Sequence, residues 1–124
     1  MPEPIRAQQS AVIREVGLRD GLQSLQTVLP TARKIEWIHA AHAAGQREIE
    51  VGSFVPARLL PQLADTAAVV AHALTLPGLT VLALVPNLRG AQAALTAGVH
   101  KITVPVSASP AHSMANVRKS PQAM

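Results

Sequence analysis

An arginine and an aspartate lie side by side in a short segment bounded by glycines, directly after the first apolar run of the chain. Arg19 and Asp20 stand between Gly17 and Gly21, and residues 11–16 precede them. A guanidinium offers a rigid fork of N–H donors, and a carboxylate is a hard oxygen ligand for a divalent cation. The two glycines predict a sharp turn with positive φ. The segment therefore predicts a site for oxygen-rich chemistry at the end of a strand.

Two more carboxylates share one face of a second predicted strand, residues 47–51. Glu48 and Glu50 alternate there with apolar residues, so both acids point to the same side. Strands of a parallel sheet are buried on both faces, so each carboxylate needs a partner or access to water. We expect Glu50, nearer the carboxyl end, to pair with Arg19. The alternative is an ion pair that only stiffens the sheet.

The elements that must position these residues alternate between strand and helix four times. Thr31 is a candidate N-cap, Gly45 and Gly98 close helices, and Pro77-Gly78 marks a turn. This alternation is typical of βαβ units with parallel strands and right-handed crossovers, which makes the chain an α/β protein. The predicted strands are residues 11–16, 47–51, 79–85 and 99–106, and the predicted helices are 31–44, 59–74 and 88–97.

Polar or turn-forming residues follow each predicted strand. Parallel α/β folds bind ligands beyond the carboxyl ends of their strands, so these residues predict one continuous site-bearing rim. The alternative is that βα loops are polar in any case, and this interpretation is favoured for the two serines after the fourth strand. The residues are Arg19-Asp20, Gly52-Ser53-Phe54, Pro86-Asn87 and Ser107-Ala108-Ser109.

Composition excludes several classes of protein. The 124 residues are 48% hydrophobic and 2% aromatic, with no cysteine, which excludes disulfides, zinc–thiolate sites and thiol nucleophiles. The net charge is +4, but all seven acidic residues lie at or before Asp65 and the basic excess beyond it is scattered. Without a basic cluster or stacking aromatics, nucleic acid is not the expected partner. With no secretory leader and no apolar run that could span a bilayer, we expect a cytoplasmic protein without membrane contact.

The histidines give weaker evidence of a functional site. His39 and His42 are three residues apart on a predicted outer helix and could in principle bind a metal, but a surface or packing role is favoured. The same holds for His72 and His100, whereas His112 lies nearer the rim but stands alone. The segment from residue 17 to residue 21 fits neither the P-loop nor the dinucleotide fingerprint.

Four motifs, in order, resemble one enzyme family. They closely resemble the hydroxymethylglutaryl-CoA lyases of the metal-dependent TIM-barrel superfamily named after its Asp-Arg-Glu signature, which also holds isopropylmalate and homocitrate synthases. The resemblance runs from residue 12 to residue 124. The motifs are VGLRDGLQ (16–23), IEVGSFVP (49–56), PQLAD (61–65) and VPNLRG (85–90).

The resemblance implies cleavage of 3-hydroxy-3-methylglutaryl-CoA to acetyl-CoA and acetoacetate, a step of leucine breakdown. It implies that Asp20 binds Mg²⁺ or Mn²⁺ and that Arg19 stabilises charge on the thioester or enolate oxygen. By the same carry-over Glu50 orients Arg19 and supports the metal site, while Gln23 and Ser53 contact the acyl-CoA substrate.

The chain also departs from the family pattern. Leu18 replaces the usual proline, and the later His-x-His metal ligands and the loop with a catalytic cysteine are absent. A full barrel needs about 250 residues. We therefore expect a flexible segment at 1–10 and, at 11–124, about four βα units forming the N-terminal half of a TIM (β/α)8 barrel. Such a half barrel would be inactive alone and would hold the metal weakly; the alternative is a non-catalytic half-barrel interaction module that self-associates through exposed sheet edges.

Overall fold

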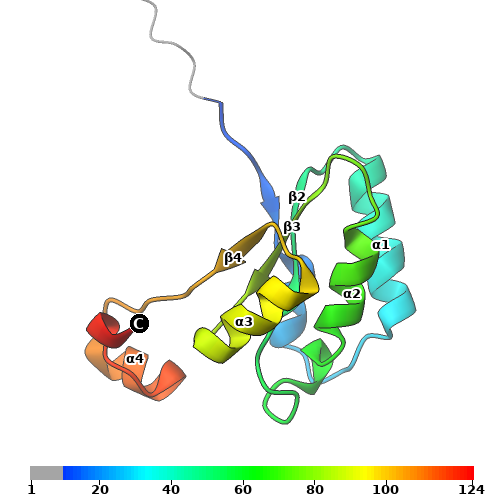
Figure 1. Cartoon of the computed structure of the whole chain (residues 1–124). Helices are drawn as coiled ribbons and strands as arrows, with labels where there is room; N and C mark the ends of the chain where they lie inside the picture. The colour runs from blue at the N-terminus through cyan, green and yellow to red at the C-terminus, as the bar shows by residue number, and fades with distance from the viewer. Residues whose placement is uncertain (1–9) are drawn as a thin grey trace, which may run out of the picture.

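A four-stranded parallel sheet, in the order β1-β2-β3-β4, forms the centre of the computed structural model (Figure 1). The structure describes residues 10–124, so the predicted flexible segment at 1–10 lies, apart from Ser10, outside the described residues. Sequential parallel neighbours joined by helices are the repeating unit of a barrel wall. The strands are β1 (Arg14–Glu15), β2 (Glu48–Ser53), β3 (Thr80–Leu84) and β4 (Lys101–Thr103).

The helices follow the strands in turn. A five-residue π-type turn, η1, comes after β1, and two short 3-10 segments, η2 and η3, precede α2 and follow α4. Helices α1 and α2 lie side by side against the sheet, whereas α4 sits apart from them beyond an extended segment (Figure 1). Their bounds are η1 (Gly17–Gly21), α1 (Thr31–Ala43), η2 (Pro61–Leu63), α2 (Thr66–Ala73), α3 (Leu88–Ala97), α4 (Pro110–Val117) and η3 (Pro121–Ala123).

The hydrophobic core lies between the sheet and the helices. Ile49 and Val51 of β2 and Val81 of β3 belong to one buried cluster with Ile38 of α1 and Val69 of α2. All are aliphatic, as the composition predicts for strands covered by helices. Because Ile49 and Val51 face the helices, the alternating residues Glu48 and Glu50 face the opposite side of the sheet.

Several predicted element bounds were wrong. The first strand covers two residues instead of 11–16 and the fourth covers three instead of 99–106, because each lies at an edge and has a partner on one side only. Helix α2 begins at Thr66 rather than near residue 59. Pro61 keeps the preceding residue out of the helical region, so the segment before α2 forms a separate 3-10 turn. Thr31 is the first residue of α1 and does not cap it; its hydroxyl donates to Asp65.

Other predictions were confirmed. Helix α3 has the predicted bounds, and Gly98 ends it in the left-handed conformation with φ 89°. Gly45 and Gly78 have φ values of 99° and 73°, which suit the predicted helix end and turn.

Apolar side chains are exposed along the two edges of the sheet and on α4. They surround strands that have one neighbour each, so both edges offer unpaired backbone groups as well as apolar surface. None of the helices described between residues 10 and 124 is long and apolar enough to cross a membrane. The exposed residues are Val12, Ile13, Ile102, Val104, Val106 and Met114.

Candidate functional site

Arg19 and Glu50 meet at the carboxyl end of the first two strands. The Arg19 Nε donates to Glu50 Oε1 at 2.5 Å, and Thr103 Oγ1 of β4 donates to the other carboxylate oxygen at 3.0 Å. The Glu50 side chain is 2% exposed and that of Arg19 is 16% exposed. Arg19 Nη1 also donates to Asp20 Oδ1 at 3.2 Å. Of the five N–H donors of the guanidinium, three therefore have no partner among residues 10–124.

The turn that carries Arg19 differs from the predicted one. Gly17 and Gly21 do not have positive φ; the chain forms a π-type turn in which the Asp20 amide donates to the Val16 carbonyl at 2.7 Å. Gly17 is required for another reason. A Cβ there would lie 2.7 Å from the Trp37 ring and 2.7 Å from the Glu15 carboxylate, so any larger residue would force these side chains to move. Leu18, where the resemblance leads us to expect proline, is fully buried and anchors the turn in the core.

The Asp20 side chain is exposed to solvent. Its exposed fraction is 66%, and its contact is the one with Arg19. Residues 10–124 contain no cluster of three or more His, Asp or Glu side chains arranged to hold a metal ion. Divalent ions such as Mg²⁺ take about six oxygen ligands. One carboxylate does not make a site, so the residues around Asp20 do not on their own fit an oxygen-ligated cation such as Mg²⁺.

Glu48, two residues before Glu50 on β2, forms a second charged layer on the same face of the sheet. Glu48 receives Arg14 Nε at 3.2 Å and the Lys101 ammonium from β4. The hydrogen bond from Lys101 has the largest influence and, with Arg14, holds the pKa of Glu48 below its ordinary value, although burial opposes the shift. Both oxygens of this carboxylate have cationic partners, so this layer binds β1, β2 and β4 together.

Ser53, the last residue of β2, carries an unusual buried hydroxyl group. Its Oγ is the one buried side-chain N or O atom in the described part of the chain that has no hydrogen-bond partner. A bulge in β2 between Glu50 and Gly52 shifts the register of the last two residues. A Cβ on Gly52 would lie 2.4 Å from Thr66 Oγ1, and that oxygen accepts the Ser53 amide at 3.2 Å. This close packing fixes the Ser53 backbone and leaves its buried hydroxyl without a partner.

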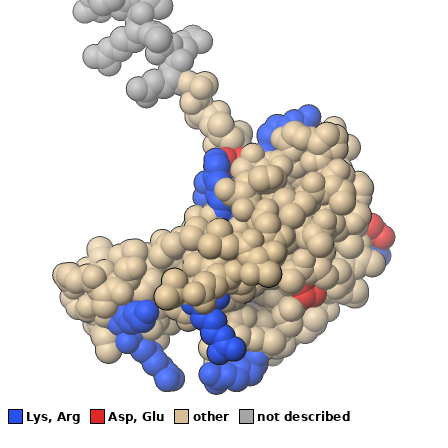
Figure 2. Space-filling model, in the orientation of Figure 1, with Lys and Arg blue, Asp and Glu red and all other residues tan. Residues whose placement is uncertain are grey.

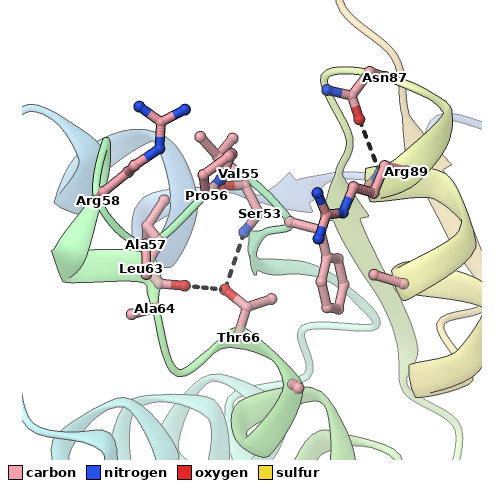
Figure 3. Close-up of a pocket in the computed structure, with 14 residues that line it drawn as sticks. Ser53, Val55, Pro56, Ala57, Arg58, Leu63, Ala64, Thr66, Asn87 and Arg89 are labelled. Carbon is pink, nitrogen blue, oxygen red and sulfur yellow. Dashed lines mark hydrogen bonds between the residues drawn. The ribbon is translucent and has the colours of Figure 1, made fainter.

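Ser53 lines a pocket of about 500 Å³ between the loop after β2 and the start of α3. Figure 3 shows Ser53 between Arg58 on one side and Arg89 on the other. Asn87 caps α3 by accepting the Gly90 amide at 2.9 Å, so the helix N-terminus also borders the pocket. In Figure 2 basic side chains stand out along the lower edge of the molecule, beneath α3 and α4. Two guanidinium groups and a helix N-terminus suit an anionic ligand.

Gln23 is exposed and takes part in the structure through its backbone. Its carbonyl, at 3.0 Å, and that of Leu25, at 2.8 Å, accept hydrogen bonds from Gln62 Nε2. Lys34 is fully buried and donates to the Gln62 carbonyl at 2.6 Å and to Asp65 Oδ1 at 2.5 Å. This network ties the segment after η1 to α1 and α2. The structure does not bring the Gln23 side chain to Glu50.

Four of the five histidines lie apart from this rim, and the fifth, His112, contacts Ser107 in the segment after β4. His39 and His72 contact each other on the outer helices, and His42 contacts the Pro77 carbonyl at 2.8 Å. His100 Nδ1 accepts the Val81 amide at 2.9 Å. His112 lies 2.5 Å from Ser107 Oγ, in the loop and helix that follow β4.

Comparison with known proteins decides the family. The HMGL-like family matches residues 11–124, almost the whole chain. The chain belongs to the HMGL-like family.

Named relatives of the HMGL-like chain are lyases. A Pseudomonas aeruginosa 3-hydroxy-3-isohexenylglutaryl-CoA/hydroxy-methylglutaryl-CoA lyase is 46% identical over 103 residues, which are 83% of this chain and 34% of the relative. The crystal structure of a Bacillus subtilis HMG-CoA lyase matches with a TM-score of 0.83 and 39% identity, over 97% of this chain and 39% of that one. An Acinetobacter baumannii HMG-CoA lyase, solved with coenzyme A and 3-methylmalate, matches with a TM-score of 0.82 and 37% identity, over 88% of this chain and 36% of that one.

The HMGL-like chain thus spans between a third and two fifths of the length of these relatives. Its parallel sheet with alternating helices corresponds to the N-terminal portion of a TIM-barrel HMG-CoA lyase, as the four motifs predict. The predicted contact between Arg19 and Glu50 is present.

Sequence reasoning did not single out four residues of this rim. Two of them are threonines that lie outside the four motifs. Thr103 donates to Glu50, and Thr66 packs against Gly52. Arg58 and Arg89 gave no separate signal because isolated arginines on loops and helix starts are common. The one available signal was Arg89 within the VPNLRG motif.

Proposed function

We propose that this chain supplies the N-terminal half of the site of a lyase that cleaves 3-hydroxy-3-methylglutaryl-CoA to acetyl-CoA and acetoacetate. The observation that carries the proposal is the buried pairing of Arg19 with Glu50 at the rim of an HMGL-like sheet. In the reaction the proton of the tertiary hydroxyl is removed, the carbon–carbon bond breaks, and the acetyl-CoA enolate that leaves is protonated.

In this proposal Arg19 stabilises the negative charge that develops on the thioester oxygen. Glu50 accepts the Arg19 Nε hydrogen and thereby fixes the plane of the guanidinium, while the Thr103 hydroxyl holds the Glu50 carboxylate in place. A donor that is fixed before the charge develops stabilises a transition state without reorganising. Glu50 acts through Arg19 and is a positioning residue.

We propose that Ser53 contacts the substrate, since its buried hydroxyl has a hydrogen bond to give within a pocket lined by Arg58 and Arg89. An acyl-CoA is long and carries several phosphate charges, which the two guanidinium groups would attract. The coenzyme A in the Acinetobacter baumannii lyase supports this class of substrate. Gln23 stays a predicted substrate contact; its exposed position leaves its side chain free to reach a ligand.

A divalent cation, Mg²⁺ or Mn²⁺, belongs to the proposal as a shared site to which Asp20 contributes one carboxylate. Such an ion, if held there, would lower the pKa of a bound hydroxyl and neutralise oxyanion charge. Its other ligands must come from outside the described residues. A role in leucine catabolism and a cytoplasmic location remain predictions that accompany the proposed activity.

A chimera tests the proposal without requiring the isolated chain to be active. Residues 11–124 replace the matching segment of the Pseudomonas aeruginosa lyase, and release of acetyl-CoA and acetoacetate is measured with Mg²⁺ or Mn²⁺. The proposal expects cleavage by the chimera, loss of cleavage in Arg19→Met, and none by the 124-residue chain alone. A folded chimera that releases no acetyl-CoA contradicts the proposal.

The exposed sheet edges favour a second candidate, association of two copies of the chain. Ile102, Val104 and Val106 present apolar side chains along and beyond β4. Covering them with a second copy would remove apolar surface and pair an open strand edge. Sedimentation equilibrium separates the outcomes: a discrete dimer supports this interaction module, and a monomer across micromolar concentrations contradicts it.

A further inference from the structure

Two histidines from different helices meet on the outer face of the molecule, away from the rim that carries Arg19. His39 lies on α1 and His72 on α2, and their Nε2 atoms are 2.7 Å apart. The ring centroids are 4.9 Å apart and the ring planes meet at 61°. The packing of α1 against α2, which lie side by side in Figure 1, brings together residues 33 positions apart in sequence.

At this separation one hydrogen lies between the two nitrogens, so one ring donates and the other accepts. Within residues 10–124 neither ring makes another hydrogen bond. The contact is exposed to solvent, where a neutral hydrogen bond contributes little because water competes with it. Two imidazoles that converge through the same nitrogen, with their remaining surroundings open, are also the arrangement that binds a metal ion.

We propose that His39 and His72 form a binding site for a divalent transition-metal ion of the Zn²⁺, Ni²⁺ or Cu²⁺ class, held by the two Nε2 atoms. Zinc–nitrogen bonds of 2.0–2.1 Å at a tetrahedral centre set the two nitrogens about 3.4 Å apart. The present separation needs to open by about 0.7 Å, which small rotations of the exposed His39 ring and the half-buried His72 ring supply. The donating ring moves its proton from Nε2 to Nδ1, so that both Nε2 lone pairs face the ion.

The donor atoms determine which ions this site takes. Imidazole nitrogen suits Zn²⁺, Ni²⁺ and Cu²⁺, whereas Mg²⁺ prefers oxygen ligands. Glu36, one turn before His39, is engaged by Arg33 at 2.7 Å, and the His42 ring is engaged by the Pro77 carbonyl. Water therefore completes the coordination, and the two imidazoles set the affinity.

The site joins two helices that pack against the same sheet. An ion that binds the folded chain and not the unfolded one raises the stability of the folded state in proportion to its occupancy. Bound metal therefore holds α1 against α2, on the face opposite the carboxylates of β2. This inference does not depend on the proposed lyase activity.

Zinc binding by the untagged 124-residue chain tests the site. Isothermal titration with ZnCl₂ at pH 7.5 should give one ion per chain, and His39→Ala or His72→Ala should each weaken binding by about tenfold or more, since losing a ligand costs at least as much as losing a supporting group. His42→Ala and His112→Ala are the matched controls and should bind as the wild type does.

Two further measurements separate this site from the proposed lyase site. Asp20→Asn should leave zinc binding unchanged, and MgCl₂ should not compete with ZnCl₂. The EPR spectrum of the Cu²⁺ complex should show coupling to two nitrogens in the wild type and to one in His72→Ala. Absence of zinc binding by the wild type, or equal affinity in wild type and His39→Ala, overturns the proposal.

Discussion

Glu48 and Glu50 lie two residues apart on the same strand and face, yet they have different surroundings. Glu50 is buried, with one arginine and one neutral hydroxyl as partners. Glu48 has two cationic partners, Arg14 and Lys101, whose side chains are 39% and 52% exposed. Both oxygens of Glu48 face cations whose side chains reach solvent, whereas Glu50 holds an arginine whose side chain is only 16% exposed. Position along β2 therefore distinguishes two roles. The ion pairs of Glu48 hold the strands together, whereas Glu50 orients Arg19 toward a ligand.

Removing the Glu50 carboxylate should have the largest effect on stability. Glu50→Ala leaves Arg19 partly buried without its partner, which should lower the free energy of unfolding by about 3 kcal/mol, the lower end for a broken buried ion pair because Arg19 keeps some solvent access. Urea denaturation followed by circular dichroism measures the change. Glu48→Ala is the matched control and should lose less; an equal loss would erase the distinction between the two layers.

The Thr103 hydroxyl should contribute less. Thr103→Val leaves one oxygen of the buried Glu50 without its donor, so the expected loss is about 1–2 kcal/mol. Thr80→Val on the neighbouring strand is the control, since the Thr80 hydroxyl makes no side-chain hydrogen bond within the described residues, and it should change little. If both variants unfold at the same urea concentration, Thr103 does not support Glu50.

Replacing Lys101 should have the smallest effect on stability, and that effect should depend on salt concentration. Its ammonium is half exposed, so solvent and ions screen its attraction for Glu48. Lys101→Met should shift the urea midpoint slightly at low ionic strength and not at 1 M NaCl. An unchanged shift at high salt would mean that packing of the Lys101 stem, and not its charge, supports the strand.

The Glu48 layer should also make the stability of the fold depend on pH. The Lys101 ammonium, followed by Arg14, holds the folded-state pKa of Glu48 below its unfolded value of about 4.3, so its stabilising effect is complete above that value. It is lost as the pH falls through 4.3 and then through the lowered folded pKa. Urea midpoints between pH 3 and 7 should therefore fall less steeply below pH 5 for Glu48→Gln than for the wild type. Parallel curves would show that Glu48 is not the titrating group.

Much of this arrangement follows from local rules of sequence. Alternation along β2 placed both glutamates on one face, and Gly45 and Gly98 marked helix ends because their positive φ suits glycine. The order of strands along the chain put Arg19 and Ser53 at the same rim.

The features that sequence did not predict depend on contacts between distant segments. Gly17 was expected to supply a positive φ, but its role is to leave room for the Trp37 ring. The bulge that sets Ser53 depends on Gly52 packing against Thr66, and the meeting of His39 and His72 depends on how α1 packs on α2. Such contacts have no periodicity along the chain, so no pattern in a single sequence predicts them.

The most direct test of the central claim compares the two glutamates in the chimera with the Pseudomonas aeruginosa lyase. Glutamine preserves the shape of each side chain and removes its charge, so folding and activity can be measured in the same proteins. Glu50→Gln should lower kcat by about 100-fold or more, the size of effect seen when an oxyanion donor is lost, while Glu48→Gln should stay within a few-fold of the parent. Equal loss in both variants, or full activity in Glu50→Gln, would contradict the assignment of Glu50 as the residue that positions Arg19.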